Sequence, residues 1–480
     1  MADDLYERLR RIREHGNRRE HGNRRERPDL SEPTVHGASP VRHAGSRVGS
    51  HAPGPDWERL EDGVYRRRRS FPIPHRWTPQ IDRSGAWRNL SSVLRIDDPV
   101  RPLFLDVETS GLSAGSGSVA FLVGLGTFRR NELVSGAGAD RPDHEPVLLE
   151  VHQVFLSDLG AEAAYTGALH RLIERAAEAA SSPLLYVTYN GASFDLPVLR
   201  TRAIMNRRFF PEHHHLDLLP VTRRLFSSRL ESCRLGTVER DVLQCRRDRD
   251  IPGSEVPERY LSFLRTGDVS GLQDVTDHHY YDIAHLALLG LRLNEILLAA
   301  GRHESEVGDT GDVRDNLPEA DRYALIRLLL ERGSPAERTS AKELLRHLVW
   351  NGRNGGRAEL VRRSGGERWL QLARLYARTV RREQRWSELR AILRAIWEHR
   401  GDAQDAVELA KQLEHRDRDF TEALRIVTDA GERRGWDEAL QHRAHRLRRR
   451  IRRDVERGGP AVSGSDSGRA PRTSGPIGTS

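Results

Sequence analysis

Two acidic residues of this chain stand in a pattern that suits metal-assisted hydrolysis. Asp106 and Glu108 lie two positions apart in the apolar run PLFLDVETSGL. Residues with that spacing on a strand point to the same face of the sheet. Two carboxylates held so close repel each other unless a cation lies between them, and hard oxygen ligands favour Mg2+ or Mn2+. The pair therefore predicts a divalent-metal platform.

A third carboxylate, Asp195, follows the apolar segment LLYVT and an Asn-Gly turn that begins at Asn190. Asp195 falls where a helix is expected to begin, and an aspartate can stand there merely as a helix cap. A cap does not require the neighbouring Asn190, Phe194 and Pro-x-Leu pattern. We therefore predict that Asp195 belongs to the same site, with Asn190 and Phe194 contacting substrate or supporting the site.

A fourth carboxylate lies in the run HHYYDIAHLALL, which has the pattern of an amphipathic helix. His278 and Asp282 are one helical turn apart and share a face, whereas Tyr281 points elsewhere. A metal-binding carboxylate beside a histidine that can take a proton from water is a workable hydrolytic pair. His278 is therefore the predicted base.

The elements around these motifs alternate in the manner of an α/β domain between Pro102 and about Ala300. Three apolar strands are expected, in PLFLDVET, SVAFLVGLGTF and VHQVFLSDL, followed by a helix over 162–180 and a buried strand over 184–189. This order resembles the ribonuclease H fold, a mixed sheet flanked by helices. Arginines near these motifs are expected mostly on the solvated surface, some of them tracking phosphates: Arg200, Arg202, Arg223, Arg224, Arg246 and Arg247.

The three motifs resemble those of the DEDD exonuclease superfamily, and by residue type its histidine branch. Over roughly residues 70–298 the chain is similar to YprB-type ribonuclease H-like proteins, including YNGASFDLPVLRTR and DIPGSEVPERY. The resemblance implies that two metal ions are coordinated by a quartet, and that His278 accepts a proton from water. Its candidate substrate contacts are Thr109, Asn190 and Phe194. The quartet is Asp106, Glu108, Asp195 and Asp282.

Two departures from the family pattern concern the base. The family usually shows Asn after the motif histidine, where this chain has His279. The spacing from His278 to Asp282 is that of the superfamily's tyrosine branch. The choice between His278 and His279 therefore stays open on sequence grounds.

The composition and hydrophobic periodicity of the sequence change outside the nuclease-like domain, which we place at residues 70–300. Residues 1–55 and 457–480 are rich in Gly, Ser, Pro and Arg and are expected to be disordered. Residues 317–453 have helical periodicity throughout, and Ala406, Ala410 and Ala423 stand where two helices would approach closely. This region resembles tetratricopeptide repeats, with a plain helical bundle as the alternative, and a protein partner is its expected ligand.

Composition narrows the class of protein. The formal net charge of +8 and pI near 9.8 suit a polyanionic partner such as DNA or RNA. Two cysteines, Cys233 and Cys245, are too few for a disulfide framework or a cysteine zinc site. No apolar run approaches the roughly 20 residues of a membrane helix, and the charged start MADDLYERLRR is unlike a secretory signal. We therefore expect a cytoplasmic protein.

These patterns together predict a metal-dependent nuclease, specifically a 3'-5' exonuclease using two ions. Two alternatives remain open: a non-catalytic nucleic-acid-binding scaffold that keeps the nuclease fold, and an endonuclease of the ribonuclease H type. The sequence does not separate DNA from RNA, or single from double strand, because that choice depends on groove shape and contacts to the 2'-OH.

Overall fold

A computed structural model describes the segments of the chain given below, and the chain divides into two compact units. The first unit ends at Ala341 and the second begins at Lys342. Disordered tails are predicted over 1–55 and 457–480, and of these residues 1–51 and 457–480 lie outside the described residues. The described ranges are 52–81, 100–111, 117–130, 147–180, 183–247, 250–300, 317–350 and 366–456.

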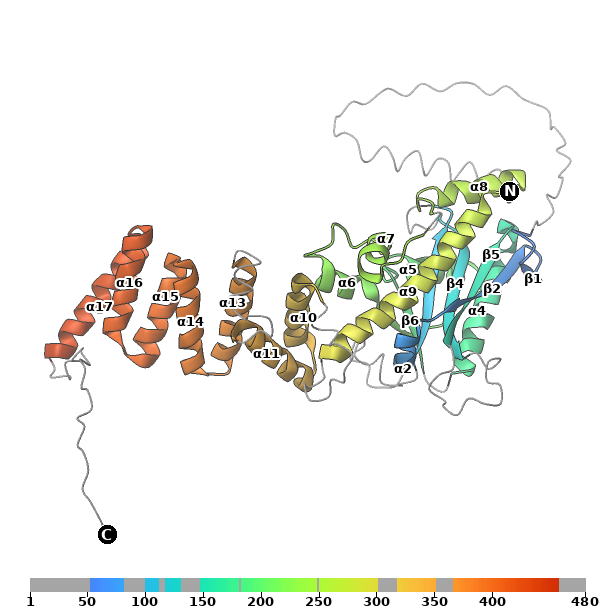
Figure 1. The fold of residues 1–480 in the computed structure, drawn as a ribbon. Helices are drawn as coiled ribbons and strands as arrows, with labels where there is room; N and C mark the ends of the chain where they lie inside the picture. Colours follow the sequence, from blue (N-terminus) through green and yellow to red (C-terminus); the bar gives the residue numbers. More distant parts are fainter. Residues whose placement is uncertain are drawn as a thin grey trace, which may run out of the picture. The chain divides into compact units, whose positions relative to one another are not determined.

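The first unit is built on one seven-stranded sheet (Figure 1). Its spatial order is β1-β2-β5-β4-β3-β6-β7. The strands β3, β4 and β5 form an antiparallel meander, and β6 and β7 extend the sheet in parallel beside β3. The predicted fold class is confirmed. In chain order the strands are β1 (Glu58–Glu61), β2 (Val64–Pro72), β3 (Arg101–Thr109), β4 (Ala120–Arg130), β5 (Val147–Leu156), β6 (Leu184–Thr188) and β7 (His214–Asp217).

The hairpin of β1 and β2 extends the sheet ahead of residue 70, where the sequence places the start of the domain. Strand β2 pairs with β5 along its whole length, although its sequence is VYRRRRSFP. Its Arg67 is buried and donates two hydrogen bonds to the Gln153 side chain, at 3.1 and 2.9 Å. The burial of a guanidinium on this strand is thus compensated by a partner on β5.

Helices cover both faces of this sheet. Along β3 the side chains alternate: Phe104 lies in a core shared with Ile283 of α9, and Leu105 lies in a core shared with Tyr165 of α4 and Leu196 of α5. The two cores therefore sit on opposite faces. The helices are α2 (Thr78–Ile81), α4 (Glu162–Glu178), α5 (Asp195–Met205), α6 (Leu218–Phe226), α7 (Leu235–Val238), α8 (Val256–Thr266), α9 (Leu272–Ala300) and α10 (Glu319–Arg332), with a π-helical turn η5 (Glu239–Leu243) after α7.

The long helix α9 crosses the sheet against strand β4 at a glycine. A Cβ at Gly124 would lie 1.9 Å from Ile283 Cδ1 and 2.7 Å from His279 Cε1, so only a residue without a side chain permits this approach. Gly124 is also the register partner of Asp106. The helix is therefore seated directly beside the strand pair that carries the acidic motif.

The described residues of the second unit are helical, as predicted. Its small residues Ala406, Ala410 and Ala423 are fully buried, which agrees with the predicted close approach of helices. The tetratricopeptide assignment stays a prediction. The helices are α13 (Glu367–Arg382), α14 (Trp386–Arg400), α15 (Ala403–Gln412) with η7 (Leu413–Asp417), α16 (Phe420–Arg434) and α17 (Glu438–Glu456).

The division between the units falls within α11 (Pro335–Trp350). The sequence places the start of the helical region at Leu317, but α10 packs in the first unit. Its Leu325 and Leu328 share a core with Val221 of α6. Within the described ranges, no helix is both long and apolar enough to cross a bilayer.

Candidate active site

Strand β3 holds the first two carboxylates of the site. Asp106 and Glu108 are half-buried, with 21% and 16% of their side chains exposed. They alternate with Leu105 and Val107, whose side chains lie in the core on the other face. Both acids therefore face the side of the sheet that α9 covers.

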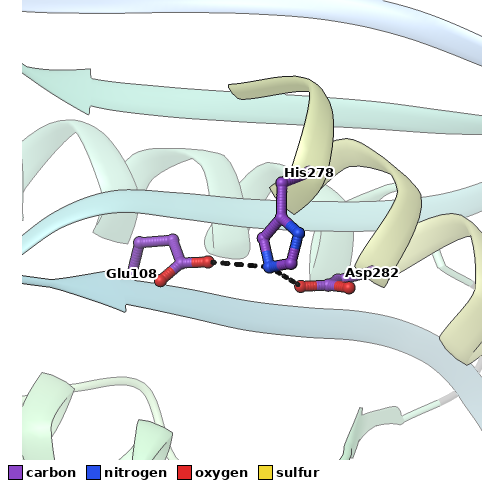
Figure 2. Close-up of side chains that lie close together, drawn as sticks. All are labelled: Glu108, His278 and Asp282. Carbon is purple, nitrogen blue, oxygen red and sulfur yellow. Dashed lines mark ion pairs between the residues drawn. The ribbon is translucent and has the colours of Figure 1, made fainter. Parts of the chain in front are cut away.

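Helix α9 brings a histidine and a third carboxylate to the same place (Figure 2). The Nε2 atom of His278 lies 3.2 Å from Asp282 Oδ2 and 4.0 Å from Glu108 Oε1. One ligand atom from each of these three residues lies within 4.8 Å of the others, and this is the one such group found among the described residues. Two carboxylate oxygens and an imidazole nitrogen form a donor set that fits a divalent cation.

Asp195 reaches the site from the turn after β6, the strand that neighbours β3 on the edge away from β4. It is the first residue of α5, it is buried, and the backbone of Val107 on β3 hydrogen-bonds its carboxylate. Strand β6, which leads into this turn, runs parallel to β3. Asp106 and Asp195 are not members of the three-residue group above, but both are electrostatically coupled to Asp282.

The turn that delivers Asp195 is held by Asp217, at the end of β7. Its carboxylate accepts hydrogen bonds from the backbone N–H groups of Asn190, Ala192 and Leu219, at 2.8, 3.1 and 3.0 Å. These contacts support Asn190 in its left-handed conformation, with φ of 67°. Asp217 therefore positions the loop from β6 to α5.

The residues expected to contact substrate occupy different environments. Asn190 is exposed on the turn, and Phe194 is half-buried directly before Asp195. Thr109 is buried, and its hydroxyl donates to the Gly111 carbonyl at 2.5 Å. Asn190 and Phe194 are thus at least partly accessible to a ligand. The Thr109 side chain is buried and hydrogen-bonded to the backbone just after β3.

The carboxylates disturb one another's ionisation. Burial, followed by repulsion from Asp282 and Asp195, raises the pKa of both Asp106 and Glu108 well above the usual range. Burial raises the pKa of Asp195 to about 7, and repulsion from Asp217 and Asp282 adds to it. Without a cation, Asp195 is therefore partly protonated near neutral pH.

A divalent cation is expected to stabilise the fold more at alkaline than at acidic pH. The folded pKa of Asp195 is raised, so this group favours the folded state at low pH and loses that contribution as the pH rises from about 4 to about 7. A bound cation replaces the protons and restores the stability lost at high pH. Calorimetric melting with Mn2+ or with EDTA should show a larger shift at about pH 8 than at about pH 5. Equal shifts at both pH values would contradict this.

A buried arginine contributes positive charge to the site. Arg247 is 6% exposed, and its Nη2 lies 2.5 Å from Asp282 Oδ1. The same guanidinium pairs with buried Glu239, and its Nη1 donates to the His278 carbonyl at 3.2 Å. Arg247 belongs to a group of arginines expected mostly on the solvated surface, and it is one that lies at the site instead, because Asp282 and Glu239 compensate its burial.

Asp250 orients the imidazole of His278. Its Oδ1 lies 2.6 Å from Nδ1 of His278, a distance at which that nitrogen donates its proton to the carboxylate. We infer from this contact the tautomer in which Nε2 carries no proton. The lone pair of Nε2 then faces Glu108 and Asp282, where it can bind a cation or accept a proton.

The neighbouring histidine has a different place. His279 is fully buried, its Nδ1 lies 3.0 Å from the Gln153 side-chain amide, and its Nε2 lies 3.2 Å from the Asp106 carbonyl oxygen. Burial lowers the pKa of His279 to about 4. With both ring nitrogens engaged inside the protein, His279 fixes α9 on the sheet, and the geometry favours His278 as the base.

Comparison with known proteins agrees with this arrangement. Residues 103–294 match the model of the RNase_H superfamily, a range that begins in β3 and ends in α9. The chain is also 26% identical over 335 residues to a protein of Bacillus subtilis (strain 168) described as "Uncharacterized protein YprB". That alignment covers 68% of this chain and 67% of the relative. These matches support a ribonuclease H-like domain that contains the whole candidate site.

Proposed function

We propose that a ribonuclease H-like protein with this site is a metal-dependent nuclease that hydrolyses phosphodiester bonds. The observation that carries the proposal is the convergence of side chains from β3 and α9, distant in sequence, at one place. Glu108, His278 and Asp282 offer ligand atoms within 4.8 Å of one another. Asp106 and Asp195 add negative charge beside them. This is a donor set for a hard divalent cation.

The residues around the cation position have separable tasks in the proposed reaction. Asp250 holds the His278 ring so that Nε2 can accept the proton of an attacking water. Arg247 holds Asp282 and stands beside the site as a fixed positive charge. A divalent cation bound by the carboxylates would supply Lewis-acid stabilisation of charge on the phosphate and a more acidic water.

We further propose the more specific activity, digestion from a 3' end with two cations. Its support is the resemblance of all three sequence motifs to DEDD exonucleases, together with a number of carboxylates sufficient for two ions. The identity of the cation is proposed as Mg2+ or Mn2+, because the ligands are mostly carboxylate oxygens. DNA or RNA is the proposed substrate.

A non-catalytic scaffold is the weaker proposal. A protein that used the fold only to bind would gain nothing from carboxylates whose pKa values are raised by burial and by mutual repulsion. Substitution by neutral residues would relieve that cost. The presence of all four acids, with a histidine oriented by Asp250, favours catalysis.

Digestion of labelled DNA and RNA in Mg2+, Mn2+ or EDTA tests the proposal. We expect shortening of at least one substrate with a divalent cation and none in EDTA, because the carboxylates alone cannot stabilise charge on the phosphate. A covalently closed circle incubated beside the linear form separates exonuclease from endonuclease activity. An exonuclease leaves the circle intact, whereas cutting of the circle would indicate an endonuclease. Failure to digest any substrate with either cation would count against nuclease activity.

A further inference from the structure

Helix α17, the last helix among the described residues of the second unit, presents a basic face to solvent. Its buried residues Leu440, Ala444 and Leu447 form one stripe at helical spacing. Outside this stripe, four of the exposed arginines form two pairs that are each one turn apart. We call these the outer arginines: Arg448, Arg449, Arg452 and Arg453.

Elsewhere in the described part of this unit, many arginines are matched by acids, whereas Arg378 and Arg382 of α13 have no carboxylate partner. Some pairs join alternate helices, as Arg374 of α13 does with Asp405 of α15, and Arg394 of α14 with Glu422 of α16. On α17 itself, Arg443 and Arg446 pair with Glu414 of η7. In the described part of the chain, no ion pair or hydrogen bond joins the outer arginines to a carboxylate. Other matched arginines are Arg381, Arg385, Arg390, Arg400, Arg425, Arg433 and Arg434.

Solubility alone does not account for this arrangement. A terminal helix of a stacked array needs a polar outer face, and mixed charges would provide one. The pairs Arg448–Arg452 and Arg449–Arg453 instead place like charges one turn apart, which destabilises a helix. The helix dipole favours cations in the last turn only, and Arg448 and Arg449 lie more than one turn before Glu456. A polyanionic partner would relieve the repulsion.

We propose that the outer arginines of α17 bind the phosphate backbone of a nucleic acid. Guanidinium groups bind phosphate oxygens through paired hydrogen bonds, and rows of them attract a polyanion without reading its sequence. The second unit then holds the substrate of the nuclease proposed above, on which this assignment of the ligand rests. Nucleic acid thereby replaces a protein as the ligand proposed for α17.

The test is the binding of labelled DNA and RNA oligonucleotides to the full chain in EDTA, so that hydrolysis cannot occur. The α17 variant carries Arg448→Gln, Arg449→Gln, Arg452→Gln and Arg453→Gln. We expect its affinity to fall about tenfold or more at moderate salt. The slope of log affinity against log salt concentration should become shallower by about 3, since each lost phosphate contact removes about 0.7 to 0.9.

A charge-matched variant serves as the control. It carries Arg374→Gln, Arg381→Gln, Arg425→Gln and Arg433→Gln, which are exposed arginines of the same unit that already have carboxylate partners. It lowers the formal net charge of +8 by the same four units. Its salt slope should match that of the parent. Circular dichroism melting of both variants checks that the helices remain folded.

Several outcomes would overturn the proposal. Equal binding by the parent and the α17 variant would show that the outer arginines do not contact phosphate. Equal losses in both variants would show that net charge alone attracts the nucleic acid. Stronger binding to phosphatidylserine vesicles than to any oligonucleotide would assign the face to a membrane surface. Failure of the nuclease proposal is read separately, from the digestion panel, because binding in EDTA requires no catalysis.

Discussion

Replacing Asp106 with asparagine is expected to slow metal-dependent hydrolysis on the order of 10³-fold or more, because cation-mediated stabilisation of the transition state is worth several kcal/mol. The amide preserves the shape of the side chain but removes its charge. Asp106 couples to Glu108, Asp195 and Asp282, so its neutralisation weakens the whole negative site. The measurement is the initial rate of digestion of the best substrate in the panel.

The stability of the Asp106→Asn variant separates a chemical defect from a folding defect. Repulsion among the carboxylates opposes folding when no cation is present, so the variant should melt in EDTA at the parent's temperature or above it. Asp274→Asn is a matched control, because Asp274 is an exposed acid of α9 paired with Arg259 on the outside of the site. That control should digest at the parent's rate. An Asp106→Asn protein as fast as the parent would refute the proposed mechanism.

Replacing His278 with alanine is expected to lower the hydrolysis rate by roughly 10²- to 10⁴-fold, the usual worth of a positioned general base. Its Nε2 faces the carboxylates, and its Nδ1 is held by Asp250. Asp250→Ala should cause a smaller loss, since the imidazole remains but is no longer oriented. Single-turnover digestion with cation in excess measures the chemical step for both variants.

His279→Ala provides the contrast that identifies the base. His279 is fully buried with both ring nitrogens engaged, so its loss leaves a cavity and unsatisfied polar groups that cost about 1 to 3 kcal/mol. We expect a lower melting temperature for His279→Ala and a nearly unchanged one for His278→Ala. A rate loss confined to His279→Ala would assign the base to the other histidine.

Much of the first unit could be predicted from sequence because its central strands are short apolar runs bounded by turns. The apolar runs that form β3, β4, β5 and β6 could all be identified as strands from the sequence. Strand β2 could not be identified in this way, because four consecutive arginines hide its periodicity. Its place in the sheet depends on pairing with β5 and on the partners of Arg67, which are tertiary contacts.

The candidate site was predictable only where local spacing carried the information. Asp106 and Glu108 share a strand face, and His278 and Asp282 share a helix face, so sequence alone relates them. Arg247 and Asp250 lie between η5 and α8, where no strand or helix periodicity shows which way a side chain points. In a chain with 78 lysine and arginine residues, an arginine is also an uninformative type. Only folding reveals that this one is enclosed.

The order of the site's parts along the chain sets the moment at which activity could first appear during synthesis. Asp106 leaves the ribosome 176 residues before Asp282, since 282 minus 106 is 176. At about 5 to 20 residues per second, that interval is roughly 10 to 35 seconds. During it, the nascent chain carries strands β3 to β7 but no α9. Under the proposed function, a polysome translating this message would therefore hold chains that cannot yet hydrolyse nucleic acid, and activity would arrive only once α9 has been made.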